Sequence, residues 1–468
     1  MSTWQDRSLS INDIPLSDNQ RVFLKEFIVK FNKKTKSSKA FAQEYRGVLA
    51  DSKAASGFRP SMKEIFYPIV GSSSRGAMMK DIDGNDYIDV TMGYGSNLLG
   101  NNPDFITSAI SNEATSGVAL GTRSKEVGRV AELITMVTGH DRVAFCNSGT
   151  EAVMSAIRLA RAQSKKTLVV VFAGSYHGHS DLTHFKILQD GSSNEAVPSL
   201  GVPSNMLDNL LILEYGSAES LQEIDKNADS LAAVLVEPVQ AKNPSFYPSE
   251  FLKDLRELTE NRGVTLIFDE MITGFRAHPA GIQGLLGIKA DISTYGKIIG
   301  GGLPMGVVAG KSIYLDYIDG GRWQYEDDSY PPSARVFFAG TYSQHPVTLA
   351  ASKALLKYIY KSGEELQANL NKMTSDFCEE MNVFFASERV PIKFIYFSSM
   401  FRLQMPSFLD IFYYMLMYKG IYICEWRNCF FSTAHSEKDT QKIINVVKES
   451  VYELKAAGFI ENSLLEED

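Results

Sequence analysis

The chain has 468 residues, of which 44% are hydrophobic and 22% are charged, and this ordinary globular composition can bury a large core. The formal net charge of -8 and the sequence pI near 5.6 argue against a nucleic-acid-binding surface. The four cysteines have no metal-like spacing, so we expect free thiols and no metal site. The N-terminus lacks the apolar segment of a secretory signal, and the longest apolar run, residues 411–418, is too short to span a bilayer. We therefore expect a cytoplasmic protein with no membrane partner.

The N-terminal part of the chain is polar and helix-prone. A helix over residues 18–33 would carry apolar side chains on one face, namely Val22, Phe23, Phe27, Ile28 and Phe31. A basic, serine-containing link follows this helix, and we interpret residues 1–60 as a helical arm or connector. Residues 61–103, with a hairpin around Asp83-Gly84-Asn85, are expected to form the N-terminal part of a smaller domain.

From about residue 104, helical and strand patterns alternate, which is typical of a mostly parallel sheet with crossover helices. Helices are predicted at 104–116, 125–138, 150–164, 249–262 and 346–361. Strands are predicted at 142–146, 168–173, 210–214, 232–237, 264–269, 292–296 and 306–310. The alternation predicts a large α/β domain over residues 104–345.

Residues 346–468 are expected to form the C-terminal part of the smaller domain. After residue 365 the pattern mixes helix and strand, which favours an α+β arrangement. The predicted elements there are helices at 365–384 and 437–457 and short strands at 393–404, 421–424 and 429–432. The acidic tail from Glu461 onward is expected to fray.

Lys297 stands between a short apolar strand and a turn that contains Gly300, Gly301 and Gly302. A lysine that attacks a carbonyl must first lose its proton, so it needs a partly desolvated pocket. Consecutive glycines let the backbone approach a flat cofactor where side chains would collide. We interpret Lys297 as a lysine that forms a Schiff base. The competing interpretation is a surface lysine before a flexible loop.

A second stretch, Asn147-Ser148-Gly149-Thr150, follows an apolar strand and opens a helix. The free N–H groups at that helix start, together with the hydroxyls of Ser148 and Thr150, predict a cradle for a phosphate dianion. The same residues also fit an ordinary helix N-cap. Thr341, in a segment that precedes another helix, offers a further phosphate hydroxyl.

Asp269 ends an apolar run that reads as a central parallel strand, and the carboxyl ends of such strands face the ligand crevice of open α/β sheets. An acid there can keep a pyridine nitrogen protonated, which makes the ring an electron sink. Metal binding by Asp269 and Glu270 is the competing idea, but neighbouring residues on a strand point to opposite faces. Tyr176 or His177, after another strand, can cover the face of a planar ring, although loop packing is the simpler interpretation.

These pieces occur together in one order along the chain. The motifs are Asn147-Ser-Gly-Thr-Glu-Ala152, Tyr176-His-Gly178, Asp269-Glu-Met-Ile-Thr-Gly-Phe-Arg276, Lys297-Ile-Ile-Gly-Gly-Gly-Leu-Pro-Met-Gly306 and Gly340-Thr-Tyr-Ser343. Together they resemble the class III (subgroup II) aminotransferases of pyridoxal-phosphate fold type I, the group that contains glutamate-1-semialdehyde aminomutase. The resemblance implies an α/β fold with a large domain and a smaller one, and pyridoxal 5′-phosphate, alternating with its pyridoxamine form, as the cofactor.

The resemblance also implies roles for individual residues. Lys297 would be the Schiff-base lysine, Asp269 the partner of the pyridinium nitrogen, and Tyr176 or His177 the residue stacked on the ring. The other cofactor contacts that it implies are Ser148, Gly149 and Thr150 at the phosphate, Glu237 and Gln240 near the ring hydroxyl, Ile272, and Thr341 at the phosphate of the neighbouring subunit. A phosphate ligand from across the subunit interface requires a homodimer.

Four further segments, 38–46, 57–64, 319–331 and 420–435, look like those of aminotransferase domains in hybrid polyketide and nonribosomal peptide synthetases. That likeness implies conversion of a β-ketoacyl thioester on an acyl carrier protein to the β-amino thioester, in natural-product biosynthesis. Glutamate or glutamine is the expected amino donor.

Three details of this reading concern the substrate. Arg276 or Arg427 can clamp the donor's carboxylate, with ordinary ion pairing as the alternative role. The aromatic insertion at 323–330 and Trp426 can line an acyl channel, with lid packing as the alternative. The chain has Ser343-Gln344-His345 where the aminomutases usually have Ser-Gly-Asn.

Two other functions remain open from the sequence. One is an aminotransferase or aminomutase that acts on a small free aldehyde or keto acid, similar to glutamate-1-semialdehyde. The other is a catalytically silent scaffold of the same fold that binds no cofactor.

Overall fold

The computed structural model describes residues 15–189 and 194–460 and divides the chain into two compact units. Of the described residues, those within 104–371 form the larger unit, and residues 15–103 with 372–460 form the smaller one. The start of the expected arm and the acidic tail lie outside the described residues. The second boundary lies at 371 rather than at the expected 345, because α12 (Pro346–Ser362) packs against helices α5 and α6 of the larger unit.

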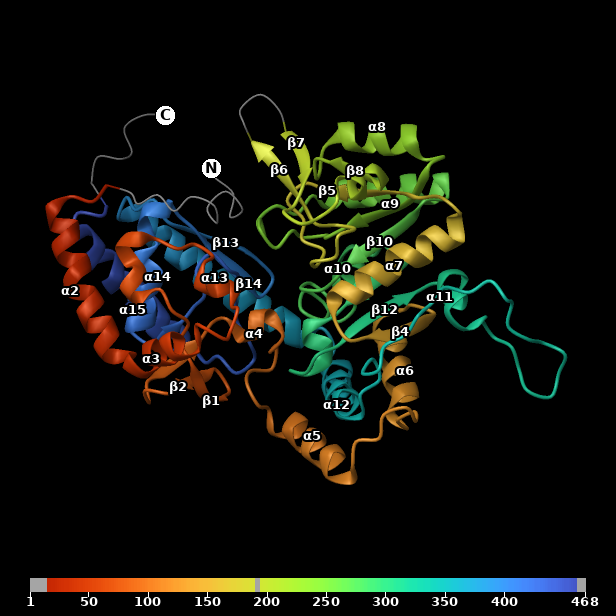
Figure 1. Ribbon diagram of the computed structural model, residues 1–468, viewed down its shortest axis with the longest axis horizontal. Coiled ribbons are helices and arrows are strands. Elements are labelled where there is room, and N and C mark those ends of the chain that lie inside the picture. Colours follow the sequence, from red (N-terminus) through yellow and green to blue (C-terminus); the bar gives the residue numbers. More distant parts are fainter. Residues whose placement is uncertain (1–14, 190–193, 461–468) are drawn as a thin grey trace. The chain divides into compact units, whose positions relative to one another are not determined.

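The larger unit is organised on a sheet with the strand order β4-β12-β11-β10-β9-β5-β8 (Figure 1). Its strands are β4 (Arg142–Cys146), β5 (Leu168–Phe172), β8 (Leu210–Leu213), β9 (Leu231–Val236), β10 (Thr265–Asp269), β11 (Ile292–Tyr295) and β12 (Gly306–Gly310). Strand β12 runs antiparallel to both neighbours, and the other pairs are parallel. Every residue of β9 to β12 is buried, as expected for strands covered on both faces. The predicted mostly parallel α/β sheet is confirmed.

Helices and one hairpin complete the larger unit. The α-helices are α5 (Asp104–Ser116), α6 (Glu126–Thr138), α7 (Gly149–Ser164), α8 (Ala218–Asn227), α9 (Ser249–Arg262), α10 (Gly281–Leu286), α11 (Ser312–Asp319) and α12. The short 3₁₀ turns are η3 (Ser204–Asn209) and η4 (Lys297–Gly300), and the hairpin consists of β6 (Phe185–Gln189) and β7 (Asn194–Pro198). Helix α7 lays an apolar face on the sheet, where it shares a core cluster with residues of β5, β9 and β12. The segment between α11 and α12 runs out from the sheet as a long loop (Figure 1).

The smaller unit contains a sheet β1-β2-β3-β15 and a sheet β13-β14-β16. The strands are β1 (Gly71–Arg75), β2 (Met78–Asp81), β3 (Asp86–Asp89), β13 (Lys393–Phe397), β14 (Met400–Gln404), β15 (Ile421–Tyr422) and β16 (Cys429–Phe430). The helices are α2 (Asp18–Lys34), α3 (Lys36–Tyr45), α4 (Met92–Gly95), α13 (Glu365–Ser387), α14 (Ile411–Tyr418) and α15 (Glu437–Ala456), with η1 (Ser52–Ala54), η2 (Pro60–Ile65) and η5 (Ser407–Leu409). The division between the units falls within α13.

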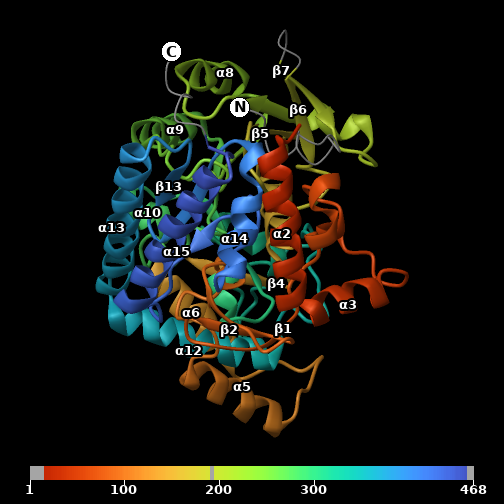
Figure 2. The ribbon, with the colours of Figure 1, turned by 90° about the vertical axis from the view of Figure 1, so that its left-hand side faces the viewer.

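Helix α2 belongs to the core of the smaller unit and is not a separate arm. Its side chains Leu24, Phe27 and Phe31 join a core cluster that includes α14 and α15, and these helices lie together in Figure 2. Val22, which was expected on the apolar face, is 59% exposed. The basic link after α2 forms helix α3.

The cysteines form no disulfide bonds in this structure. The cysteines Cys146, Cys378, Cys424 and Cys429 are all free, and Cys424 alone among them is incompletely buried. Among residues 15–189 and 194–460, no helix combines the length and apolar character needed to cross a membrane.

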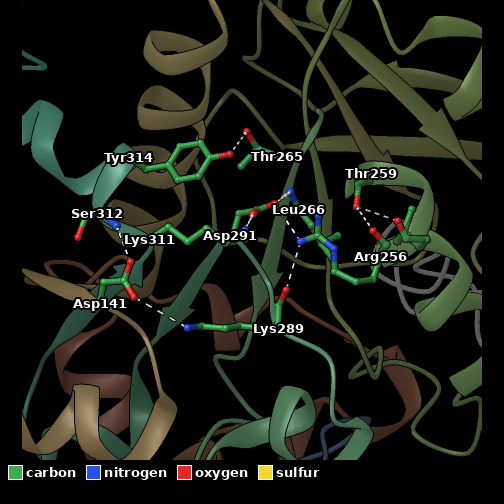
Figure 3. Close-up of polar contacts among 11 residues, drawn as sticks. Asp141, Arg256, Thr259, Thr265, Leu266, Lys289, Asp291, Lys311, Ser312 and Tyr314 are labelled. Carbon is green, nitrogen blue, oxygen red and sulfur yellow. Dashed lines mark hydrogen bonds and ion pairs between the residues drawn. The ribbon is translucent and has the colours of Figure 1, made fainter. Parts of the chain in front are cut away.

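A buried ion-pair network around Asp291 fixes the start of β11 (Figure 3). One carboxylate oxygen of Asp291 lies 2.6 Å from Lys311 Nζ, and the other accepts hydrogen bonds from Arg256 Nη1 at 3.0 Å and from the Leu266 N–H at 2.8 Å. The Asp291 and Arg256 side chains are only 6% and 11% exposed. The network therefore joins α9, β10 and the end of β12 to the strand that leads to Lys297.

Removing the acid should be costly because it leaves a guanidinium buried without its carboxylate. We predict that Asp291→Ala lowers the free energy of unfolding by about 3–5 kcal/mol, measured by urea unfolding with circular dichroism and fluorescence. The matched control is Asp225→Ala, which breaks an exposed pair with Arg262 and should change stability little. Equal effects of the two substitutions would contradict the role given to Asp291.

Candidate active site

Lys297 occupies a constrained turn directly after β11. Its φ angle is +49°, a left-handed conformation that side-chain-bearing residues seldom adopt. The preceding residue, Gly296, has no room for a side chain, since a Cβ atom there would lie 2.7 Å from Met271 Sδ. Strained backbone of this kind persists only where the surroundings enforce it, and it gathers at functional sites. The turn therefore sets the position of the Lys297 side chain.

Asp269 and His177 form a buried pair at the ends of β10 and β5. His177 Nδ1 lies 2.7 Å from Asp269 Oδ2, and both side chains are 2% exposed. The Met271 N–H donates to the other oxygen, Oδ1, at 3.2 Å. A carboxylate oxygen only accepts hydrogen bonds, so the imidazole carries a hydrogen on Nδ1 and donates it to Asp269. His177 is thus engaged with Asp269, whereas Tyr176 is 57% exposed and has an accessible ring.

Glu237, directly after β9, is a second buried acid whose charge interacts with those of Asp269 and His177. Burial, reinforced by the charge of Asp269, raises the pKa of Glu237 to about 7 from an ordinary 4.5. Burial also lowers the pKa of the Lys297 amine, and the charges of Asp269 and Glu237 offset part of that shift. The charges of Asp269 and Glu237 therefore act on the Lys297 amine. A lysine in this setting gives up its proton more readily than one in water.

The start of helix α7 lies beside this cluster. Ser148 is the N-cap residue: its Oγ accepts a hydrogen bond from the Glu151 N–H, so the ordinary capping interpretation is confirmed. The neighbouring N–H groups of Gly149 and Thr150 belong to the first turn, where intrahelical partners are missing, and they can still bind an anion. A Cβ on Gly149 would lie 2.6 Å from Met271 Sδ, and one on Gly178 would lie 2.4 Å from Thr150 Oγ1. The helix start is therefore closely surrounded by backbone that only glycine permits.

Met271 was not predicted as a site residue. Its sulfur lies against both Gly149 and Gly296, which places it between the helix start and the turn of Lys297. The only signal in the sequence is its position two residues after Asp269. Ile272, which was predicted at the cofactor, is the next residue and is half-buried.

Gln240 and Thr341, which were predicted as cofactor contacts, have protein neighbours in this structure. Gln240 Nε2 donates to the Ala173 carbonyl at 2.8 Å and to Ser175 Oγ at 3.0 Å. Thr341 is exposed and follows Gly340, where an added Cβ would lie 3.1 Å from Asn147 Nδ2. The turn that carries Thr341 thus lies near the residue before Ser148.

Glu270 does not share a site with Asp269. Its carboxylate accepts hydrogen bonds from the Ile282 and Gln283 N–H groups and from the Thr273 hydroxyl. The two adjacent acids therefore have separate partners, as expected from the opposite directions of neighbouring strand residues.

The proposed substrate-binding residues fall in different units. Arg276 is 1% exposed in the larger unit, burial lowers its pKa to about 9, and its charge acts on Lys297. Arg427 and Trp426 belong to the smaller unit. In the long loop after α11, Tyr325 and Tyr330 are 85% and 82% exposed.

Comparison with known proteins now defines the class. Residues 60–392 match the family described as aminotransferase class-III, and the chain belongs to this family. It is 36% identical over 403 residues to glutamate-1-semialdehyde 2,1-aminomutase 2 of Lachnoclostridium phytofermentans, which covers 81% of this chain and 90% of that protein.

Solved structures agree on the fold. The crystal structure of an omega-transaminase from Sphaerobacter thermophilus superposes with a TM-score of 0.78 at 26% identity, over 89% of this chain and 98% of that one. A transaminase with PLP bound superposes with a TM-score of 0.79 at 24% identity, over 91% and 99%. The chain is a fold type I enzyme of the pyridoxal-phosphate-dependent class III aminotransferase family, and pyridoxal phosphate is its cofactor.

The residues present fit this cofactor. The glycine-lined start of α7 suits a phosphate, and the buried acid Asp269, held by His177, suits a ring nitrogen. Lys297, with its lowered pKa and its remaining partial exposure, suits an aldehyde.

The raised pKa of Glu237 predicts how stability depends on pH. Between its ordinary pKa of 4.5 and about 7, the folded protein keeps a proton that the unfolded chain has lost, so this group's contribution to stability falls as pH rises through that window. Glu237→Gln removes the ionisation. In the cofactor-free protein its melting temperature, relative to the wild type, should therefore rise by about 3 °C between about pH 5 and about pH 8. A difference that stays constant over this range, measured by differential scanning fluorimetry, would rule out the buried ionisation.

Proposed function

We propose that this enzyme transfers an amino group to or within a small free aldehyde or keto acid, as an aminotransferase or aminomutase. The observation that carries the proposal is the strained turn of Lys297 and the buried pair of Asp269 and His177, with Met271 packed between that turn and the start of α7. The names of the relatives support the substrate class, because the curated proteins it matches include glutamate-1-semialdehyde aminomutases.

Each residue of the cluster has a definite task in this proposal. Lys297 would hold the cofactor's aldehyde, Asp269 its ring nitrogen, Tyr176 one face of its ring, and Ser148, Gly149 and Thr150 its phosphate. Met271 and Ile272 would lie near the ring. Bound pyridoxal phosphate supplies an electron sink for the negative charge that develops on the substrate carbon.

Proton movement would be the work of the protein. The Lys297 amine, with its pKa lowered by burial, is suited to take the proton from the substrate carbon and return it at the position that the product requires. The hydrogen bond between His177 Nδ1 and Asp269 would fix the orientation of the carboxyl group beside the ring nitrogen.

The partners in the proposal are an amino-acid donor, with glutamate or glutamine preferred, and a second copy of the chain. Thr341 of one subunit would reach the phosphate held by the other, so the homodimer would be the active unit. The support for this arrangement is the motif Gly340-Thr-Tyr-Ser343, which is part of the resemblance to the family.

A second candidate is amination of a β-ketoacyl thioester on an acyl carrier protein. It is favoured by the open, aromatic loop after α11, in which Trp323 and Tyr325 pack edge to face with ring centroids 5.1 Å apart. A tethered acyl chain needs an accessible apolar approach of this kind. The replacement of Ser-Gly-Asn by Ser343-Gln344-His345 also favours a substrate other than that of the aminomutases.

Lys297 should be indispensable. We predict that Lys297→Ala abolishes the visible absorbance of the protein incubated with pyridoxal phosphate and lowers kcat by at least about 10³-fold, because both the covalent link and the proton carrier are lost. Lys289→Ala, which removes a half-exposed lysine near Asp141, is the control and should keep both properties. A wild-type protein that takes up no pyridoxal phosphate would instead favour the silent scaffold.

The acceptor can be identified by one competition experiment. Glutamate or glutamine is offered as donor with either a free β-keto acid or aldehyde, or the same acyl group on an acyl carrier protein, and products are followed by intact-mass spectrometry. We predict that the free acceptor gains the amino group at a kcat/KM at least about tenfold higher, since the cluster requires only a small carbonyl compound. Amination confined to the carrier-bound acyl group would reverse the assignment.

A further inference from the structure

Two neighbouring loops of the larger unit are tied together by side chains. One loop, residues 173–176, follows β5, and the other, residues 237–241, follows β9, and these two strands are parallel neighbours. Glu237 Oε2 accepts from the Tyr176 N–H at 3.2 Å, and Glu237 Oε1 accepts from the Ala241 N–H at 2.9 Å. Gln240 adds its two bonds to Ala173 and Ser175.

The orientation of the Gln240 amide follows from its partners. A carbonyl oxygen only accepts, so the atom that faces Ala173 O must be the nitrogen. The Nε2 group has two hydrogens, and Ala173 and Ser175 take both. The amide oxygen of Gln240 lies against Gly174: a Cβ atom added to Gly174 would lie 2.9 Å from Gln240 Oε1. Gln240 therefore has no amide hydrogen left to donate to a cofactor.

Burial makes these bonds consequential. Glu237 is 6% exposed and Gln240 is 7% exposed, so neither can exchange its protein partners for bulk water at little cost. The ionisable groups that act on Glu237 or feel its charge are Asp269, His177, Lys297 and Tyr215. The backbone N–H groups of Tyr176 and Ala241 favour the charged carboxylate against burial. The two side chains thus hold the segment from Ala173 to the N–H of Tyr176, which leads into the tyrosine.

We propose that Glu237 and Gln240 act as a clamp that positions Tyr176 over the cofactor ring, and that they are positioning residues rather than ligands of the ring hydroxyl. This inference rests on the proposed function, in which Tyr176 covers that ring. Cofactor affinity would then depend on the hydrogen bonds between the two loops. The loops after β5 and β9 must keep their spacing for the Tyr176 ring to lie flat on the cofactor ring.

A double-mutant cycle tests the clamp. The probe is pyridoxamine 5′-phosphate, which has no aldehyde and binds reversibly. Its Kd is measured by fluorescence titration of the purified cofactor-free protein, in whichever oligomeric state it has. Gln240→Ala should raise the Kd about tenfold in the wild-type background, because two buried hydrogen bonds are lost. In the Tyr176→Ala background the same change should raise it less than about twofold, since the residue through which the clamp acts is gone.

Other roles for Gln240 predict other results in this double-mutant cycle. If Gln240 contacts the ring directly, its effect persists at the same fold-change in the Tyr176→Ala background, and the clamp is overturned. An unchanged Kd for Gln240→Ala in the wild-type background also overturns it. Gln240→Met, which keeps the volume and removes the amide, replaces Gln240→Ala if that variant does not fold.

Two controls separate this inference from the proposed function. Gln283→Ala removes another buried glutamine whose amide donates to a carbonyl, that of Thr138 at 2.7 Å, and it should leave the Kd unchanged. Failure of the wild type to bind the probe would refute the proposed function, whereas binding with an additive cycle would refute the clamp alone. Glu237→Gln supplies an independent readout. Because this substitution removes a carboxyl group that ionises near pH 7, the Kd should depend less on pH in that range.

Discussion

The burial of one amine among carboxylates is the constraint on which the rest of this structure depends. Charges removed from water are costly unless each has partners, and here Lys297 faces Asp269 and Glu237. The acids in turn are held by His177 and by backbone N–H groups. Parallel strands make this possible because β9, β10 and β11 bring their carboxyl ends to one edge of the sheet.

Strand β11 is secured at both ends so that Lys297 can occupy a strained turn. At its start, the Asp291 network ties it to the neighbouring strands and to α9. At its end, Gly296 packs on Met271, which also packs on the first residue of α7. The positive φ of Lys297 is therefore enforced by packing on one side and by ion pairing on the other. A substitution in either support would shift the amine without touching it.

The sequence predicted the larger unit well because its strands are continuous apolar runs and its helices are amphipathic, so local pattern and tertiary environment agree. Lys297 and Asp269 were singled out by the same pattern, since Lys297 comes soon after such a strand and Asp269 ends one, and their roles stay predictions. The choice between Tyr176 and His177 was beyond local pattern, because the hydrogen bond of His177 to Asp269 joins residues 92 positions apart. The membership of α12 in the larger unit and of α2 in the smaller core depends likewise on long-range packing, which periodicity does not specify.

The chemistry of the cluster and the choice of substrate are carried by different residues. In the proposed function, Lys297 and Asp269 would handle a proton and a ring, tasks that are common to every amino-group transfer, so they would not discriminate among acceptors. Residues 343–345 are different, because they end the turn that carries Thr341 and lead into α12, with His345 as its N-cap. Ser343 Oγ donates a hydrogen bond to the Gly340 carbonyl at 2.9 Å. That turn lies beside Asn147, at the edge of the phosphate cradle. The departure from the aminomutase pattern therefore falls close to the start of α7 and outside the group of Lys297, Asp269 and Glu237, so in the proposed function it is a candidate for setting the choice of acceptor.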